Sequence, residues 1–173
     1  MAVRAALESD IDAVERIYDK LHTAEENGSA VIGWRRGVYP TRATALEALS
    51  AGELFVLSDG GEVCAAGRIN RRQLPEYYMV KWLHEAPDSA VMVLHTLVVD
   101  PDKKRRGYGR AFLDFYENYA RENGCAVLRI DTNVRNAAAR KMYAAFGWRE
   151  AGIVPCSFNG LPGVRLVCLE KPL

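Results

Sequence analysis

The sequence predicts a mixed α/β fold in which helices cover the faces of a central β-sheet. Segments with helical periodicity alternate with short apolar segments typical of strands, and one pair of apolar runs has the spacing of a hairpin. Hydrophobic residues make up 49% of the 173-residue chain, which is enough to bury a core. Because no repeat, low-complexity tract or linker interrupts the pattern, we expect residues 1–173 to form one domain.

The first half of the chain is predicted to contain a short strand, two helices and a hairpin. Residues 3–7 have the pattern of a strand, and apolar side chains recur at helical spacing over residues 9–21. Residues 23–40 have weak periodicity, so we expect a long loop or a broken helix there, before a helix resumes at Thr41. Two apolar runs around an Asp-Gly-Gly turn predict a hairpin over residues 54–69.

In the second half, strands and helices alternate after an irregular segment, residues 71–90, that is rich in aromatic side chains. Residues 91–100 are apolar on both faces, which is typical of a central buried strand. The elements expected after it are, in chain order, a helix from about residue 107 to 123, a strand over 125–131, a helix over 136–147 and two strands over 148–154 and 164–170.

Charge and cysteine usage exclude several classes of protein. A net charge of +1 argues against a protein-wide basic field, so we expect neither nucleic acid nor a membrane as a partner. The four cysteines form no C-x-x-C pair and the three histidines no H-x-x-x-H pair, so we expect no metal site and no disulfide framework. Because the N-terminus lacks the apolar core of a signal peptide and no stretch approaches a membrane span, we expect a cytoplasmic protein.

The stretch "KKRRGYGRAF", residues 103–112, allows two interpretations. As a basic patch it would bind nucleic acid, and as a loop that enters a helix it would bind a phosphate. The N–H groups of a first helical turn have no partners within the helix and attract anions. Glycines at positions 107 and 109 would let a pyrophosphate approach the backbone. Neither the dinucleotide fingerprint G-x-G-x-x-G nor a Walker loop is present.

The context of this loop matches a known family. "LHTLVVDPDKKRRGYGRAFLDF", residues 94–115, resembles the acyl-CoA-binding segment of the GNAT superfamily of N-acetyltransferases. The family pattern, [Q/R]-x-x-G-x-[G/A] after a strand and a proline, falls on residues 104–109, with Lys104 in place of the usual Gln or Arg. Downstream, "NAAARKMYAAFGW", residues 136–148, is similar to the second family signature, N-x-x-A-x-x-x-Y-x-x-x-G-[F/W/Y]. The element order is also similar, so the resemblance covers essentially the whole chain.

The resemblance implies a fold, a cofactor and a mode of binding. The fold would be a mixed, mostly antiparallel sheet of six to seven strands flanked by about four helices, and family members often form homodimers. Acetyl-CoA would be the co-substrate, with its pyrophosphate on the backbone of the loop and its pantetheine arm on the preceding strand. The implied cofactor-binding residues are Leu97, Val98, Val99, Lys104, Arg105, Arg106, Gly107, Tyr108, Gly109, Arg110, Asn136, Ala139 and Tyr143.

Direct transfer of an acetyl group from a thioester to an amine needs a base for the amine and an acid for the departing thiolate. Tyr143 is the candidate acid because family members carry a tyrosine here beside the CoA sulfur. The alternative is a core aromatic residue that packs with Phe146. His95 is the candidate base because it interrupts an apolar strand in an H-x-L-x-V arrangement that resembles arylalkylamine acetyltransferases. The alternative is a buried histidine bonded to a carbonyl group.

The acceptor is expected to bind among the least regular segments, because loops on a rigid scaffold carry specificity. Trp34, Tyr39 and Tyr78 are the candidate acceptor-binding residues. The sequence thus predicts an N-acetyltransferase, an acyltransferase of groups other than amino-acyl groups, that acts on a primary amine of a small molecule. A protein N-terminal or lysine acetyltransferase is a rival among enzymes, and a non-catalytic acyl-CoA sensor is a rival outside them.

Overall fold

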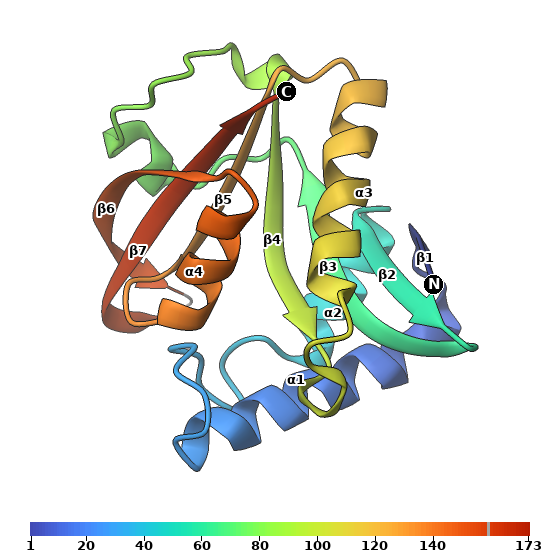
Figure 1. Ribbon diagram of the computed structural model, residues 1–173. Coiled ribbons are helices and arrows are strands. Elements are labelled where there is room, and N and C mark those ends of the chain that lie inside the picture. Colours follow the sequence, from blue (N-terminus) through green and yellow to red (C-terminus); the bar gives the residue numbers. More distant parts are fainter. Residues whose placement is uncertain (159) are drawn as a thin grey trace. The chain divides into compact units, whose positions relative to one another are not determined.

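The computed structural model describes residues 1–158 and 160–173 and has a mixed α/β fold (Figure 1). Within these residues seven strands form a mostly antiparallel sheet, in the order β1-β2-β3-β4-β5-β7-β6, and β4 pairs in parallel with β5. The strands are β1 (Ala2–Ala5), β2 (Leu54–Asp59), β3 (Glu62–Asn70), β4 (Val91–Val99), β5 (Val127–Asn133), β6 (Arg149–Phe158) and β7 (Leu161–Pro172). The helices are α1 (Ile11–Glu26), α2 (Arg42–Ser50), α3 (Tyr108–Glu122) and α4 (Ala137–Ala145). The predicted fold class is confirmed.

The chain divides into two compact units, and the division falls inside β4 and α3. Unit 1 consists of Met1–Ala30, Trp34–Ile69 and His95–Tyr116. Unit 2 consists of Val31–Gly33, Asn70–Leu94 and Glu117–Leu173. The first half of β4 therefore belongs to unit 2 and the second half to unit 1.

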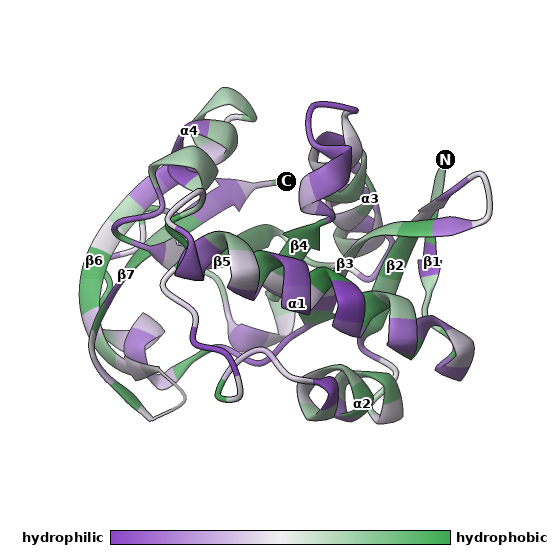
Figure 2. Cartoon of the chain, turned by 90° about the horizontal axis from the view of Figure 1, so that it is seen from below, coloured by the Kyte–Doolittle hydropathy of each residue, from purple (hydrophilic) through white to green (hydrophobic). Residues whose placement is uncertain are grey.

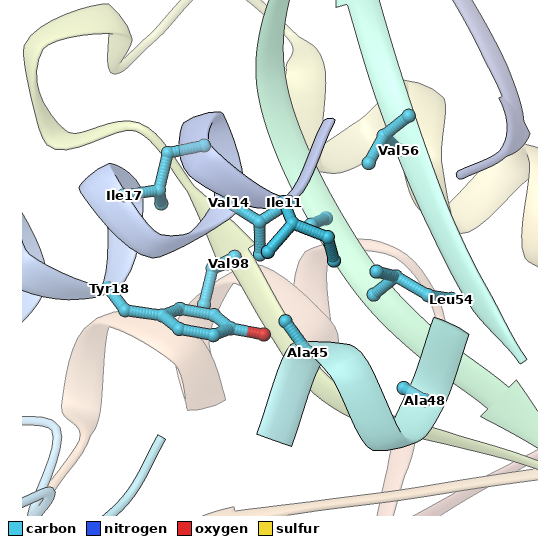
Figure 3. Close-up of a cluster of buried hydrophobic side chains, with 10 residues drawn as sticks. Ile11, Val14, Ile17, Tyr18, Ala45, Ala48, Leu54, Val56 and Val98 are labelled. Carbon is cyan, nitrogen blue, oxygen red and sulfur yellow. The ribbon is translucent and has the colours of Figure 1, made fainter. Parts of the chain in front are cut away.

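The core of unit 1 lies where α1 and α2 pack against strands. Apolar side chains of α1, including Ile11, Val14 and Ile17, are almost fully buried and meet Val56 of β2 and Val98 of β4 (Figure 3). Hydrophilic and hydrophobic residues mix along α1 (Figure 2), as expected for a helix with one buried face. The periodicity that predicts this helix from the sequence thus reflects its packing.

The loop expected over residues 23–40 begins later in the structure, because α1 continues to Glu26. Ala24 is buried and extends the apolar face by one more turn, so packing favours helix where the sequence periodicity is weak. The second helix begins as predicted, with Thr41 as its N-cap: the Thr41 hydroxyl accepts a hydrogen bond from the backbone N–H of Thr44.

Unit 2 contains a sheet with one face covered by the irregular residues 71–90. Val91–Leu94 pair in parallel with Val127–Ile130 of β5, which pairs in turn with β7. The covering segment is anchored by the fully buried Glu170 of β7, whose carboxylate accepts hydrogen bonds from the backbone N–H groups of Leu83 (2.9 Å) and His84 (3.1 Å). Burial raises the pKa of Glu170, but these two bonds together with the hydrogen bond from Arg149 outweigh it, so the pKa lies below its usual value.

The described residues contain no helix that is long and apolar enough to cross a membrane. Each of the four cysteines is a buried free thiol. Nor do the described residues include a group of three or more His, Cys, Asp or Glu side chains arranged to hold a metal ion.

Candidate functional site

The glycine loop lies between the end of β4 and the start of α3, both in unit 1. A short 3-10 turn, Pro101–Lys103, follows β4, and the Asp100 carboxylate caps it by accepting a hydrogen bond from the backbone N–H of Asp102 (3.0 Å). The first helical bond of α3 joins the Ala111 N–H to the Gly107 carbonyl oxygen (2.9 Å). Amides ahead of this bond have no acceptor within the helix, so the predicted strand, loop and helix entrance are present.

Two residues of this loop have left-handed backbone conformations. Arg105 and Gly107 have φ angles of 63° and 82°. Loops in which left- and right-handed residues alternate can turn successive N–H groups toward one anion. A β-carbon at position 107 would meet no protein atom within 4 Å, so the positive φ, rather than lack of space, requires glycine there.

The side chains of the loop supply positive charge at its rim. Lys104, Arg105 and Arg106 are exposed, and Arg110 forms an ion pair with Asp114 (3.4 Å) one turn along α3. Tyr108 behaves differently, because its side chain is buried and its hydroxyl donates a hydrogen bond to Asp59 at the hairpin turn (2.9 Å). Tyr108 is one of the residues implied for the cofactor, and only its main chain is available to contact a bound anion.

The second half of β4 is distorted just before the predicted pantetheine strand. Thr96 has a φ of 53°, an unusual value for a β-branched residue, and its hydroxyl forms a hydrogen bond with the hydroxyl of Tyr39. The ring of Trp34 packs edge-on against Tyr39, with 5.9 Å between centroids. Two predicted acceptor residues are thus brought together beside Thr96. The side chain of Val98 lies in the core of unit 1, so only its main chain is available to a ligand (Figure 3).

The second signature forms α4 in unit 2. Asn136 caps this helix by accepting a hydrogen bond from the backbone N–H of Ala139 (3.1 Å), so part of its side chain already has a structural role. Tyr143 is 4% exposed, and its ring lies 6.0 Å from that of Trp148. Burial raises the pKa of Tyr143, and the nearby charge of Asp131 raises it further, so the phenol stays protonated at neutral pH.

Sequence reasoning missed Asp131, a carboxylate near the end of β5. The hydroxyl of Tyr77, a buried residue of the covering segment, donates a hydrogen bond to Asp131 Oδ2 (2.8 Å). Burial raises the pKa of Asp131 to about 6, although the hydrogen bond from Tyr77 acts in the opposite direction. A carboxylate in the apolar run "CAVLRID" is the same kind of signal as His95 in its strand, and it could have indicated this site.

The two neighbouring tyrosines of the covering segment have different surroundings. Tyr77 is 1% exposed and reaches Asp131, whereas Tyr78, the predicted acceptor residue, is 70% exposed and donates to Asp88 (3.1 Å). His95 is half-buried in the part of β4 that belongs to unit 1. Asp131 and Tyr143 belong to unit 2, and His95 is the first residue of β4 assigned to unit 1.

The strand order, the glycine loop at the start of α3 and the helix of the second signature fit the class of acyl-CoA-dependent transferases. Comparison with known proteins gives the family. The chain belongs to the acetyltransferase (GNAT) family, whose model matches residues 14–148.

Individual relatives resemble this chain either over only part of its length or at low sequence identity. The chain is 38% identical over 60 residues to the ribosomal protein bS18-alanine N-acetyltransferase of Escherichia coli K12, a match that spans 35% of this chain and only 40% of the relative. A GNAT-family acetyltransferase structure from Streptococcus agalactiae superposes with a TM-score of 0.82 at 20% identity, covering 99% of this chain and 95% of the other. The yncA acetyltransferase of Salmonella typhimurium, solved with acetyl-CoA, gives 0.69 at 19% identity, covering 100% and 94%.

Proposed function

We propose that this chain transfers the acetyl group of acetyl-CoA directly to a primary amine of a small molecule. Membership of the acetyltransferase (GNAT) family is the observation that carries this proposal. Within unit 1, the amides around Gly107 and the cations of the loop would bind the diphosphate. The main chain of Leu97–Val99 would pair with the pantetheine arm, and Asn136 and Ala139 of α4 are the further residues that the family resemblance implies for the cofactor. Acetyl-CoA supplies the activated thioester.

Tyr143 is the proposed acid for the leaving thiolate. A thiol of this type has a pKa of about 8.5, so its thiolate is a better leaving group when a proton is delivered to it. Because burial raises the pKa of Tyr143, the phenol keeps its proton at neutral pH. It is therefore available to donate this proton to the CoA thiolate as the thiolate departs. The ring also contacts that of Trp148, with 6.0 Å between centroids.

Asp131 is the proposed base for the acceptor amine, with Tyr77 holding the carboxylate in position. With a pKa of about 6, Asp131 is ionised at pH 7 and yet more basic than an ordinary aspartate. Moving a proton from an alkylammonium group to it is uphill by about 4 pKa units, or about 5 kcal/mol. That is well within the barrier of about 17 kcal/mol that corresponds to one turnover per second. His95 is the rival base that the sequence predicts.

A second acceptor class has a specific observation in its favour. The E. coli relative N-acetylates an alanine of ribosomal protein bS18, according to its name, and shares 38% identity with this chain over 60 aligned residues. The rival proposal is therefore the α-amino group of a protein N-terminus. On this rival proposal, a peptide would have a higher kcat/KM than a free amine.

Acetyl-CoA consumption by the purified protein tests both proposals. The panel would contain alkylamines, diamines, arylalkylamines, amino acids and a short peptide that begins with alanine, and calorimetry would measure CoA binding in parallel. Turnover of free amines supports the first proposal, and turnover of the peptide alone supports the second. Binding of CoA without turnover of any amine would favour a non-catalytic acyl-CoA sensor. Failure to bind CoA would overturn both acetyltransferase proposals and the sensor alternative.

A further inference from the structure

An ion pair joins α1 to the end of β4, where the chain enters the glycine loop. Both carboxylate oxygens of Asp100 accept hydrogen bonds from Lys20 Nζ (3.0 and 2.9 Å), although the two residues are 80 positions apart in the sequence. Lys20 Nζ also lies 2.7 Å from a carboxylate oxygen of Asp102, so one ammonium group bridges two carboxylates. These residues belong to unit 1, in which α1 contacts the 3-10 turn Pro101–Lys103 (Figure 1).

Asp100 is a buried carboxylate whose main chain and side chain are both held in place. It is 5% exposed, and its Oδ1 also accepts the hydrogen bond from the backbone N–H of Asp102. Its own N–H donates to the Cys64 carbonyl oxygen of β3 (2.9 Å), and its carbonyl oxygen accepts from the N–H of Lys103 (2.9 Å). Hydrogen bonds to Asp102 and Asp100 raise the pKa of Lys20, which is therefore charged at neutral pH. Lys20 thus supplies the positive charge that a buried carboxylate needs.

The two aspartates directly precede the part of the chain that is proposed to bind an anion. Successive Cα atoms are about 3.8 Å apart, so the Cα atom of Asp102 is within about 8 Å of that of Lys104, the first residue of the family pattern. The Debye length at physiological ionic strength is about 8 Å, so charge on this turn acts on an anion held by the loop. Two carboxylates without a counter-ion would therefore oppose the binding of a diphosphate.

We propose that Lys20 is a positioning residue of the CoA site, which neutralises Asp100 and Asp102 and thereby allows the following loop to bind the diphosphate. This inference rests on the proposed binding of CoA by that loop. Lys20 acts through the two aspartates and not on the reacting atoms. Its loss should therefore weaken the binding of CoA and leave the chemical step unchanged.

The first test compares Lys20→Met with Arg42→Met in the full chain. Arg42 is the matched control because its side chain is similarly exposed, 45% against 40%, and also bridges two carboxylates, those of Asp12 and Glu15. With Lys20→Met we expect the Kd for CoA in calorimetry and the KM for acetyl-CoA to rise about 10-fold, with kcat within about 2-fold. Arg42→Met should change none of these values. An unchanged Kd with Lys20→Met overturns the proposal.

Two companion variants separate the charge of Lys20 from its packing. Lys20→Arg keeps the charge and should keep the affinity for CoA within about 3-fold. Asp100→Asn, added to Lys20→Met, removes the uncompensated charge, while its amide oxygen can still accept the N–H of Asp102. The double variant should therefore recover most of the lost affinity. A loss of affinity that Asp100→Asn does not restore would assign Lys20 a packing role and overturn the proposal.

Asp102→Asn tests the same charge effect if Lys20→Met does not fold. The Asp102 side chain is 72% exposed, so the fold should tolerate its substitution. One negative charge fewer beside the loop should strengthen the binding of CoA about 2- to 5-fold at low ionic strength, and less at about 0.5 M salt. Asp12→Asn is the matched control, because it makes the same charge change in unit 1 at a side chain that is 71% exposed.

The outcomes separate this inference from the proposed function. An equal effect of Asp102→Asn and Asp12→Asn, or no gain in affinity with Asp102→Asn, would overturn the role of Lys20 while binding and turnover of acetyl-CoA by the unaltered protein uphold the acetyltransferase proposal. Failure of the unaltered protein to bind CoA would overturn both.

Discussion

In unit 1 the candidate cofactor site is made of backbone, whereas in unit 2 the candidate groups for proton transfer are side chains. The loop around Gly107 presents amides whose direction is set by two positive φ angles, and its charged side chains lie in solvent. In unit 2 the phenol of Tyr143 and the carboxylate of Asp131 have pKa values that burial has raised. This difference indicates that the first unit is suited to binding and the second to proton transfer, so substitutions in the two units should separate affinity from rate.

The largest expected effect is the loss of the base in unit 2. We expect Asp131→Asn to lower kcat about 10²- to 10³-fold at pH 7.5 and to remove the limb of the pH profile that rises near pH 6, because that limb reports ionisation of Asp131. The dissociation constant for CoA should not change. The measurement is kcat over pH 5 to 9 for this variant, compared with the same profile for His95→Ala.

Asp88→Asn is the matched control for this substitution. Asp88 also accepts a hydrogen bond from a tyrosine, Tyr78, but at an exposed position in the same unit, so its loss should leave kcat unchanged. A large fall in kcat with His95→Ala, together with a normal profile for Asp131→Asn, would transfer the role of base to His95.

The same aspartate should reduce stability at neutral pH. The pKa of Asp131 is raised in the folded state, so the folded protein binds more protons than the unfolded chain between about pH 4 and pH 6, and stability falls as the pH rises through this window. A shift from about 4 to about 6 corresponds to roughly 3 kcal/mol at full effect. Asp131→Asn should therefore stabilise the protein in urea unfolding at pH 7.5, with little effect at pH 4. Equal effects at the two pH values would contradict the raised pKa.

The phenol of unit 2 should affect the rate with little change in stability or cofactor affinity. Tyr143→Phe is expected to lower kcat by about 10²-fold, since the thiolate would depart without a proton donor, while CoA affinity stays within about 2-fold. Tyr18→Phe is the control, because Tyr18 is a buried tyrosine in the core of unit 1 whose pKa is also raised. Equal activity of the two variants would favour the alternative in which Tyr143 only packs in the core.

The contrast between the units also explains how much the sequence could predict. The loop could be predicted from the sequence because its backbone conformation requires a particular residue type: a glycine at a positive φ directly before a helix. The carboxylate of Asp131 in its apolar run was a signal that the sequence analysis overlooked, but neither the burial that raises its pKa nor its partner Tyr77, 54 positions away in an irregular segment, could be predicted from local pattern. The α1 end at Glu26 was missed for a similar reason, since tertiary packing of Ala24 outweighs the weak local pattern. Elements with long periodic segments, such as α3 and the β2–β3 hairpin, were predicted correctly.

The smallest effect is expected for the backbone site. Gly107→Ala must place an alanine at a φ of 82°, which costs about 1–2 kcal/mol, and a loop that relaxes to avoid this strain turns its amides away from the diphosphate. We expect CoA affinity to fall about 10-fold, with kcat at saturating acetyl-CoA nearly unchanged. Gly61→Ala is the matched control, because Gly61 has a φ of 85° at an equally open position in the β2–β3 turn. Both variants should lose similar stability in urea, and only Gly107→Ala should weaken CoA binding in calorimetry. A parallel fall in kcat would mean that the loop contributes to the chemical step as well, and the division of labour between the units would then be wrong.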